Sequence, residues 1–260
     1  MIGPTGISPP ASLRARYSPQ DLTCFSEEEL QRFLGPALAN KIHTSWDETI
    51  EALAWEILYR KEPELYDRMI AGEPVSEGLL DWLPIAGDVV EVAAGTGRLT
   101  LSMPPRWSRL VAVEPVAAMR KILEARIAAD RKPDICVVEG YFDRIALPDA
   151  WADVVITCSS FTTDPGHGGQ RGLDELTRIT RKGGKMIFIS PTDIGWFIER
   201  GFDRIDFPAQ QFATFANEQE ARSIASVFYP YALDDVLPDG RVSFDALGIE
   251  PPHEAVWMIK

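Results

Sequence analysis

The chain has 260 residues with 26 basic and 39 acidic side chains, which gives a formal net charge of −13. Lys and Arg are scattered rather than clustered, so a nucleic-acid partner is disfavoured, because such a protein needs a local excess of positive charge. No apolar run approaches the ~20 residues of a membrane-spanning helix, and the start of the chain lacks the apolar core of a signal peptide, so we expect a soluble, cytoplasmic protein with no membrane partner.

The first third of the chain predicts helices and no strands. Residues 1–22 are rich in Pro and Gly and predict an irregular tail. Ser26 and Glu29 form a capping-box pair at the start of a helix that Gly35 and Pro36 end. The run 45–61 has apolar residues at helical spacing, and ELYDRMI and SEGLLDW follow as shorter helices. Residues 23–84 are therefore predicted to form a helical cap.

The pattern changes at residue 85, where short β-branched runs alternate with helical runs. DVVEV, RLVAVE, ICVVE, DVVITC and KMIFIS are apolar on both faces, as expected for parallel strands covered by helices. Helices are predicted over VAAMRKILEARIAAD, LDELTRITRK and about 209–226. RVSFDALGI and EAVWMIK are the last strand candidates, and Pro251-Pro252 between them suggests a tight turn before an antiparallel strand. Residues 85–260 are predicted to form one doubly wound α/β domain.

The strongest local signal follows the first of these strands, in EVAAGTGRL. Glu91 ends the strand, and Gly95 and Gly97 allow the backbone to turn tightly and approach a ligand. Neither the G-x-G-x-x-G dinucleotide fingerprint nor the phosphate loop is matched, so a bound nucleotide need not carry a phosphate. Glu114, at the end of the second strand, can accept hydrogen bonds from both hydroxyls of a ribose; the alternative is a solvated strand-end carboxylate.

Four ordered motifs between residues 88 and 190 resemble those of the class I S-adenosylmethionine-dependent methyltransferases, particularly the bacterial small-molecule type. Residues 91–101, EVAAGTGRLTL, are similar to the first motif, and Glu114 with Met119 to the second. The third motif corresponds to residues 140–156, and the fourth to LDELTRITRKGG at 173–184. The resemblance implies a Rossmann-like, mostly parallel seven-stranded sheet with strand order 3-2-1-4-5-7-6. It also implies S-adenosyl-L-methionine as cofactor and a small-molecule methyl acceptor as partner.

The resemblance further assigns roles to residues at the first two strand ends. Glu91 and the loop from Ala93 through Gly95 to Gly97 are expected beside the methionine part of the cofactor. Glu114 is expected to hold the ribose. Met119 is expected to pack beside the adenine.

The third motif departs from the family pattern at Tyr141. The family often has an aspartate there, which accepts a hydrogen bond from the adenine amino group. In this chain Tyr141 or Phe142 is expected to stack on the base instead, and Asp143 could supply the acceptor.

The acceptor side is predicted in the loop after the fourth strand, CSSFTTDPGHGG. Ser159 is expected where cofactor and acceptor meet. His167 is the candidate general base for an O-methyl acceptor, since an imidazole titrates near neutral pH; the alternative is a histidine on a surface loop.

The helical segment carries many aromatic side chains. They either line an acceptor pocket or form a local core. The aromatic residues in question are Trp46, Trp55, Tyr59, Tyr66 and Trp82. Because an open α/β sheet leaves a ligand exposed at its strand ends, we expect these helices to form a lid that excludes water; the alternative is packing on the flank of the sheet.

The motifs lead to three functional hypotheses. The first is a methyltransferase acting on O or N of a small molecule. The second is a non-catalytic S-adenosylmethionine-binding protein, which no sequence feature excludes because the acceptor supplies the nucleophile. The third is another enzyme on the same scaffold, such as a nicotinamide-dependent oxidoreductase, which the missing third glycine disfavours. The three cysteines form no CxxC or Cys/His cluster, so no metal site is expected.

Overall fold

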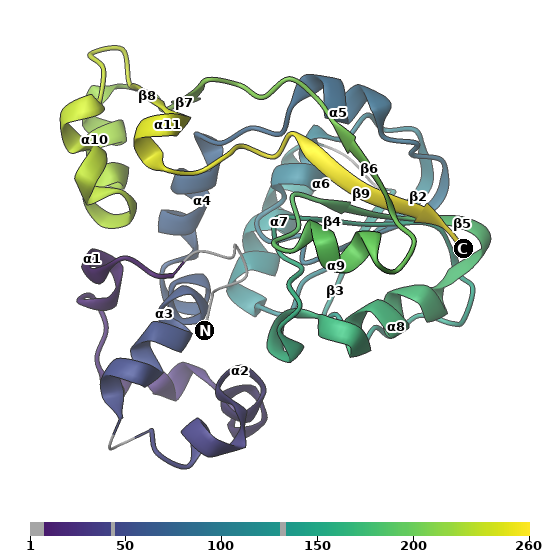
Figure 1. Ribbon diagram of the computed structural model, residues 1–260, viewed down its shortest axis with the longest axis horizontal. Helices are drawn as coiled ribbons and strands as arrows, with labels where there is room; N and C mark the ends of the chain where they lie inside the picture. Colours follow the sequence, from purple (N-terminus) through teal and green to yellow (C-terminus); the bar gives the residue numbers. More distant parts are fainter. Residues whose placement is uncertain (1–7, 43–44, 131–133) are drawn as a thin grey trace. The chain divides into compact units, whose positions relative to one another are not determined.

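The computed structural model describes residues 8–42, 45–130 and 134–260 (Figure 1). The chain divides into two compact units. One, here called the sheet unit, comprises Val75–Ala209 and Pro252–Lys260. The other, the helical unit, comprises Met1–Pro74 and Gln210–Pro251. The sequence predicted boundaries after residues 22 and 84, whereas the structure groups Gln210–Pro251 with the N-terminal helices.

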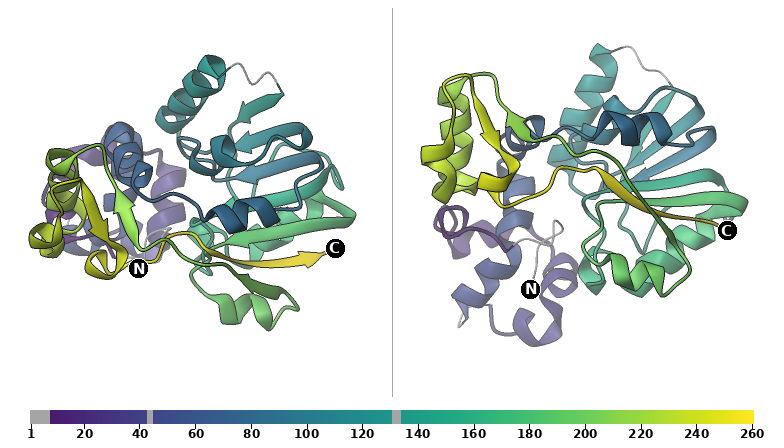
Figure 2. Two further views of the ribbon diagram at one scale, coloured as in Figure 1. Left: turned by 90° about the horizontal axis from the view of Figure 1, so that it is seen from above. Right: turned by 45° about the horizontal axis from the view of Figure 1, so that its top comes forward.

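The sheet unit is built on a seven-stranded sheet with the order β3-β2-β1-β4-β5-β9-β6 (Figure 2). Strands β1 to β5 pair in parallel, whereas β9 pairs antiparallel with both β5 and β6. In chain order this is 3-2-1-4-5-7-6 with the last strand antiparallel, so the predicted fold class and strand order are confirmed. The strands are β1 (Gly87–Val92), β2 (Trp107–Val113), β3 (Ile135–Val138), β4 (Ala152–Cys158), β5 (Thr180–Ile189), β6 (Asp203–Asp206) and β9 (Glu254–Ile259).

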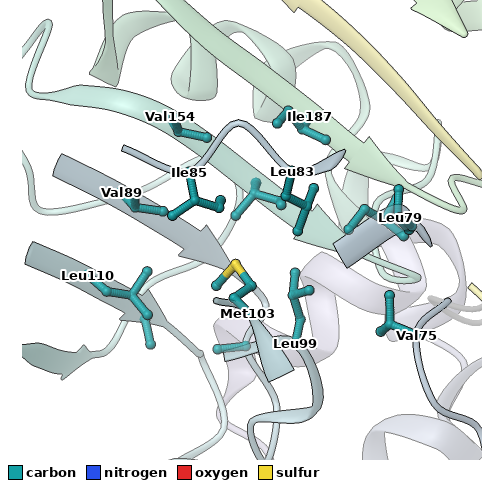
Figure 3. Close-up of a cluster of buried hydrophobic side chains, with 14 of the residues drawn as sticks. Val75, Leu79, Leu83, Ile85, Val89, Leu99, Met103, Leu110, Val154 and Ile187 are labelled. Atoms are coloured by element: carbon teal, nitrogen blue, oxygen red, sulfur yellow. The ribbon is translucent and has the colours of Figure 1, made fainter. Parts of the chain in front are cut away.

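Alternate residues of each central strand enter two separate cores. On one face, Val89, Leu110, Val154 and Ile187 pack with residues of α5 (Glu77–Trp82), α6 (Arg98–Ser102) and α7 (Ala117–Ala129). Figure 3 shows side chains of the helices and of the sheet pointing toward one another in this cluster. Because α5 buries Leu79 in this core, it belongs to the sheet unit and not to the predicted cap of residues 23–84.

On the other face, Val90, Val155 and Phe188 pack with residues of α8 (Gly169–Ile179) and α9 (Ile194–Ile198). Both faces of the parallel strands are therefore covered by helices, which explains why their sequences are continuously apolar. β6 escaped prediction because it is an edge strand whose residues are mostly exposed and charged, so it has no apolar run.

The helical unit is organised around α3 (Trp46–Lys61), which is buried along most of its length. Trp55 is 5% exposed and stacks on Phe228, with ring centroids 5.8 Å apart. The capping box of Ser26 and Glu29 is present at the start of α2. The other elements are α1 (Ala11–Arg14), η1 (Pro19–Cys24), α2 (Glu27–Ala39), α4 (Pro63–Ala71), β7 (Phe212–Thr214), α10 (Glu218–Phe228), η3 (Pro230–Asp235), β8 (Arg241–Ser243) and α11 (Phe244–Leu247).

Two stretches of the helical unit differ from prediction. Residues 8–22 of the predicted irregular tail form α1 and part of η1, because Leu13 is fully buried and Ser12 donates a hydrogen bond to the Val227 carbonyl. Residues 1–7 lie outside the described residues. The predicted strand in RVSFDALGI is only β8, which pairs with β7 in a two-stranded sheet, because Ser243 then caps α11. Throughout the described part of the chain, every helix is too short or too polar to cross a bilayer.

Candidate functional site

The site lies where the parallel strands of the sheet unit end. Glu91 of β1 is level with Ala112 of β2 and with Ile156 of β4, so the loops after these strands leave the sheet at the same edge. The strand order reverses between β1 and β4. In open α/β sheets ligands bind at such a reversal, beyond the carboxyl ends of the strands.

Glu114, directly after β2, has a buried carboxylate that receives backbone hydrogen bonds. The Gly95 N–H donates to its Oε2 over 2.9 Å, and the Val116 N–H donates to its Oε1 over 2.8 Å. Only 3% of the residue is exposed. Glu114 is therefore not the solvated strand-end carboxylate that the sequence left open. Its position links the end of β2 to the glycine loop that follows β1.

Glu91, near the end of β1, is 1% exposed. Burial raises the pKa of its carboxyl to about 8, although a hydrogen bond from the Thr100 hydroxyl to Oε2, 2.6 Å long, acts in the opposite direction. Thr100 lies in α6, so Glu91 also ties the start of that helix to the strand. A carboxyl with this pKa is largely protonated at neutral pH.

The loop between Glu91 and α6 is shaped by residues in the left-handed region. Ala93, Gly95 and Gly97 have φ angles of 60°, 58° and 101°. The φ of Gly97 favours a glycine, and a Cβ added there would lie 2.6 Å from Leu123 Cδ1, so the Leu123 side chain would have to move. Arg126 of α7 donates to the Thr96 carbonyl and so fixes the loop from the other side.

Non-glycine residues with positive φ also follow the next two strands. Ser159, directly after β4, has φ 51°, and Ser190, directly after β5, has φ 44°. Together with Ala93, residues at the ends of three neighbouring strands thus adopt a backbone conformation that is unfavourable for residues with a side chain. Such strain concentrates at functional sites, where surrounding structure holds it in place.

Arg98, which the sequence interpretation did not single out, is the first residue of α6. Its guanidinium Nη2 lies 3.8 Å from the Cys158 Sγ at the end of β4. The only sequence signal for it is its position directly after Gly97, and nothing in the pattern indicates where a long side chain at that point will lie.

The residues predicted for the adenine side differ in their surroundings. Met119, in the first turn of α7, is 3% exposed. Tyr141 is half-buried and exchanges backbone hydrogen bonds with Arg144, whose guanidinium lies 5.8 Å from its ring. Phe142 packs edge-on against Phe161 with centroids 5.1 Å apart and adds to the apolar core beside α8. Tyr141 therefore fits a stacking role better than Phe142 does.

His167 lies in a tight turn after β4, the 3-10 helix η2 (Pro165–His167). Its backbone N–H donates to the Asp164 carbonyl, and its Nδ1 is 3.9 Å from Asp164 Oδ1. The side chain is 11% exposed, so His167 is not the surface-loop histidine of the alternative interpretation. The His167 carbonyl accepts a hydrogen bond from the Thr162 N–H over 3.1 Å. The Ser159 N–H donates to the Ile189 carbonyl at the end of β5 over 2.9 Å.

Within residues 8–42, 45–130 and 134–260, no three His, Cys, Asp or Glu side chains gather as a metal site would require.

Comparison with known proteins identifies this architecture. Residues 90–188 match the family model described as a methyltransferase domain. The part of the sheet unit that carries the site is thus similar to a methyltransferase domain. The matched residues run from β1 to β5 and so include Glu91, the glycine loop and Glu114.

Individual relatives match about half of the chain. An uncharacterized methyltransferase of Mycobacterium bovis is 30% identical over 128 residues, 47% of this chain and 49% of that protein. A demethylmenaquinone methyltransferase of Thermobifida fusca is 31% identical over 135 residues, 48% of this chain and 55% of that protein. The chain thus spans about half the length of the curated relatives it matches.

Two solved structures are similar to this chain at low sequence identity and low TM-score. A methyltransferase from Aquifex aeolicus superposes with a TM-score of 0.38 at 14% identity, over 70% of this chain and 90% of that one. A phosphoethanolamine N-methyltransferase of Haemonchus contortus gives a TM-score of 0.41 at 14% identity, over 64% and 33% of the two chains.

Proposed function

We propose that the chain transfers a methyl group from S-adenosyl-L-methionine to an oxygen or nitrogen of a small-molecule acceptor. The observation that carries this proposal is the buried carboxylate of Glu114, which the Gly95 N–H holds beside the glycine loop at the strand reversal. A carboxylate at this point accepts hydrogen bonds from ribose hydroxyls, and the methyltransferase family match covers the same residues.

The donor set suits a nucleoside cofactor without phosphates. Glu114 places an acidic group at the end of β2, where an ionised carboxylate would repel a phosphate. When bound, S-adenosylmethionine supplies an electrophilic methyl group on a sulfonium. In this proposal Glu114 orients the ribose, Met119 and Tyr141 contact the adenine, and the loop from Ala93 to Gly97 faces the methionine part.

On the acceptor side, the chain's contribution is positioning and exclusion of water, with a proton acceptor where the nucleophile needs one. Ser159 and His167 lie on the loop that follows β4. We propose His167 as the group that accepts the proton of a hydroxyl acceptor. A lid formed by the predicted helices that precede α5, and the cytoplasmic location, stay predictions of the same kind.

Calorimetric titration tests the cofactor assignment first. The purified chain should bind S-adenosylmethionine and S-adenosylhomocysteine with dissociation constants in the micromolar range, about −8 kcal/mol, and bind NAD more weakly. Tighter binding of NAD than of both sulfur compounds would contradict the proposal and favour an oxidoreductase.

Turnover tests the transfer itself. Cofactor labelled on the methyl group is incubated with a panel of hydroxyl and amine metabolites, a demethylmenaquinone analogue, and RNA and DNA. Label on a hydroxyl or amine metabolite supports the proposal, and a His167→Gln variant should then lose more turnover on hydroxyl than on amine acceptors. Label on the quinone carbon or on nucleic acid would overturn the acceptor class. Tight cofactor binding with no label on any acceptor would favour the non-catalytic binding protein.

A further inference from the structure

Phe161, in the loop that follows β4, is an aromatic side chain inside the sheet unit and is 1% exposed. Its ring packs edge-on against Phe188 of β5 and against Phe142, with ring centroids 4.9 Å and 5.1 Å apart. Phe197 of α9 contacts the same ring with centroids 5.6 Å apart. The ring is therefore held by the sheet, by a helix and by the loop that follows β3.

The turn that carries His167 rests on this ring. Gly168 comes directly after His167 and has φ 124°. A Cβ added at Gly168 would lie 2.5 Å from the Phe161 Cε2, and one added at Gly172 would lie 3.2 Å from the same atom. Both glycines thus bring the backbone closer to the ring than a side chain would allow. The backbone next to His167 is therefore held at one distance from Phe161.

Hydrogen bonds join the same turn to the residue that follows Phe161. The Thr162 N–H donates to the His167 carbonyl over 3.1 Å, and the Gly169 N–H donates to the Thr162 carbonyl over 2.9 Å. Thr162 is itself buried, with 6% exposed. His167 is thus tied to Phe161 in two ways: through the ring that packs against Gly168, and through the backbone of Thr162.

We propose that Phe161 is a positioning residue for the His167 imidazole, because its ring keeps the turn, and with it the proton acceptor, at a fixed place beyond the end of β4. This inference rests on the proposed function, in which His167 accepts the proton of a hydroxyl acceptor. A general base must lie within hydrogen-bond reach of the proton that it removes, and a displacement of about 1 Å costs on the order of 100-fold in rate. Since the Phe161 ring is buried, it acts on the reaction through the backbone of the turn.

A double-mutant cycle tests this role. Transfer of labelled methyl is measured on the hydroxyl and amine metabolites that accept it, for Phe161→Leu, His167→Gln and the double variant. Phe161→Leu should lower kcat on a hydroxyl acceptor about 10–100-fold and kcat on an amine acceptor by less than about threefold. In the His167→Gln background the same substitution should cost nothing further on the hydroxyl acceptor, because residues that act as a unit are not additive.

Modification of His167 by diethyl pyrocarbonate, followed by peptide mass spectrometry, reports on the placement of the imidazole without any acceptor. The wild-type side chain is 11% exposed. Phe161→Leu should raise the modification rate of His167 about threefold or more relative to that of His253, because a loosened turn opens more often. Gly168→Ala keeps the ring but forces the turn away from it, and should raise the rate in the same way.

Phe202→Leu is the matched control. Phe202 is 4% exposed and packs against Phe188 and Phe197 in the same core. This variant should lower folding stability as Phe161→Leu does. It should leave both the ratio of turnover on hydroxyl and amine acceptors and the modification rate of His167 unchanged.

Equal losses on the two acceptors, or a loss that adds fully to that of His167→Gln, would overturn the proposal in favour of a ring that only stabilises the core. Full turnover of His167→Gln on a hydroxyl acceptor would overturn it too, since there would be no proton acceptor to position. An unchanged modification rate in both Phe161→Leu and Gly168→Ala would have the same consequence. Absence of label on every acceptor would instead contradict the proposed function, and the modification rates would still test how the imidazole is held.

Discussion

Buried carboxylates serve different purposes in the two units. In the helical unit, Glu56 is 5% exposed and lies 2.5 Å from the Arg60 guanidinium, while Glu73 accepts a hydrogen bond from the Tyr229 hydroxyl. In the sheet unit, Glu91 accepts from the Thr100 hydroxyl and Glu114 accepts from two backbone N–H groups. Charged and phenolic partners thus stabilise the helical unit, whereas hydroxyl and amide donors hold the acids of the sheet unit at strand ends.

Two contacts of the helical unit join segments that are far apart in the chain. Tyr229 and Glu73 connect the segment Gln210–Pro251 to the residues just after α4, and Arg68 pairs with Glu220 in the same way. The sheet-unit acids instead connect the loops that follow β1 and β2 with each other and with α6. Removing a partner should therefore change folding stability in one unit and ligand binding in the other.

The largest effect is expected from Arg60 in the helical unit. Its side chain is 8% exposed and contacts both Glu56 and Glu29. Arg60→Met leaves the buried Glu56 carboxylate without this cation, and breaking a buried pair costs roughly 3–5 kcal/mol. Urea unfolding followed by circular dichroism should detect that loss of stability, while the dissociation constant for S-adenosylhomocysteine stays within about twofold.

Arg222→Met provides the matched control in the same unit. Arg222 pairs with Glu218 on an exposed part of α10, so its removal should cost less than about 1 kcal/mol. Equal losses from the two variants would mean that the buried pair does not stabilise the helical unit. A large loss of cofactor affinity in Arg60→Met would contradict the expectation that changes in the helical unit alter folding stability and leave ligand binding unchanged.

The sequence predicted the sheet unit well because its signals are local. β-branched runs that are apolar on both faces have few alternatives to buried parallel strands, and the glycines after Glu91 mark a turn at a strand end. These features sufficed for strands β1 to β5 and for the location of Glu114. They did not reveal that Phe142 contributes to the core, because its edge-on contact with Phe161 depends on where the loop after β4 folds.

The helical unit could be predicted only in part, because its core joins two distant segments. The spacing of apolar residues in α3 indicated a helix, but nothing local indicates that Trp55 stacks on Phe228. The aromatic side chains that were predicted to line an acceptor pocket therefore have different surroundings. Trp55 and Tyr59 are buried within the helical unit, and Trp82 belongs to the sheet unit, where it packs against Phe207 and Trp257.

The second prediction concerns Glu91 and pH. Its pKa in the folded chain is about 8, above the ordinary value of 4.5. Between these values the folded state binds more protons than the unfolded state, so this group's contribution to stability falls as pH rises through that window and is constant above it. Wild type should lose roughly 2 kcal/mol from this group between pH 6 and 8, the slope for one proton, and Glu91→Gln should not.

Urea unfolding at pH 6, 7 and 8 without cofactor measures this difference. At pH 8, Glu91→Gln should be more stable than wild type. It should also bind S-adenosylhomocysteine more weakly, so the effect of Glu91 on folding stability is measured separately from its effect on cofactor binding. If the free energies of unfolding of the two proteins changed with pH in the same way, Glu91 would be ionised over this whole pH range. Glu91 would then be a charged buried acid like Glu56, and this difference between the two units would be absent.

The last prediction tests the ribose role of Glu114, which distinguishes a ligand-binding acid from a structural one most sharply. Glu114→Ala should weaken binding of S-adenosylhomocysteine by about 1.5–3 kcal/mol, the worth of hydrogen bonds to a charged group. Because Gly95 and Val116 also donate to this carboxylate, part of any loss could come from a loosened loop. A second ligand pair removes that ambiguity: 5′-methylthioadenosine and its 2′,3′-dideoxy analogue differ only in the hydroxyls. If Glu114 binds the ribose, wild type should prefer the hydroxylated compound and Glu114→Ala should not distinguish the two. If the variant weakens both compounds by the same factor, Glu114 acts on the loop, and the acids of the sheet unit would then be as structural as those of the helical unit.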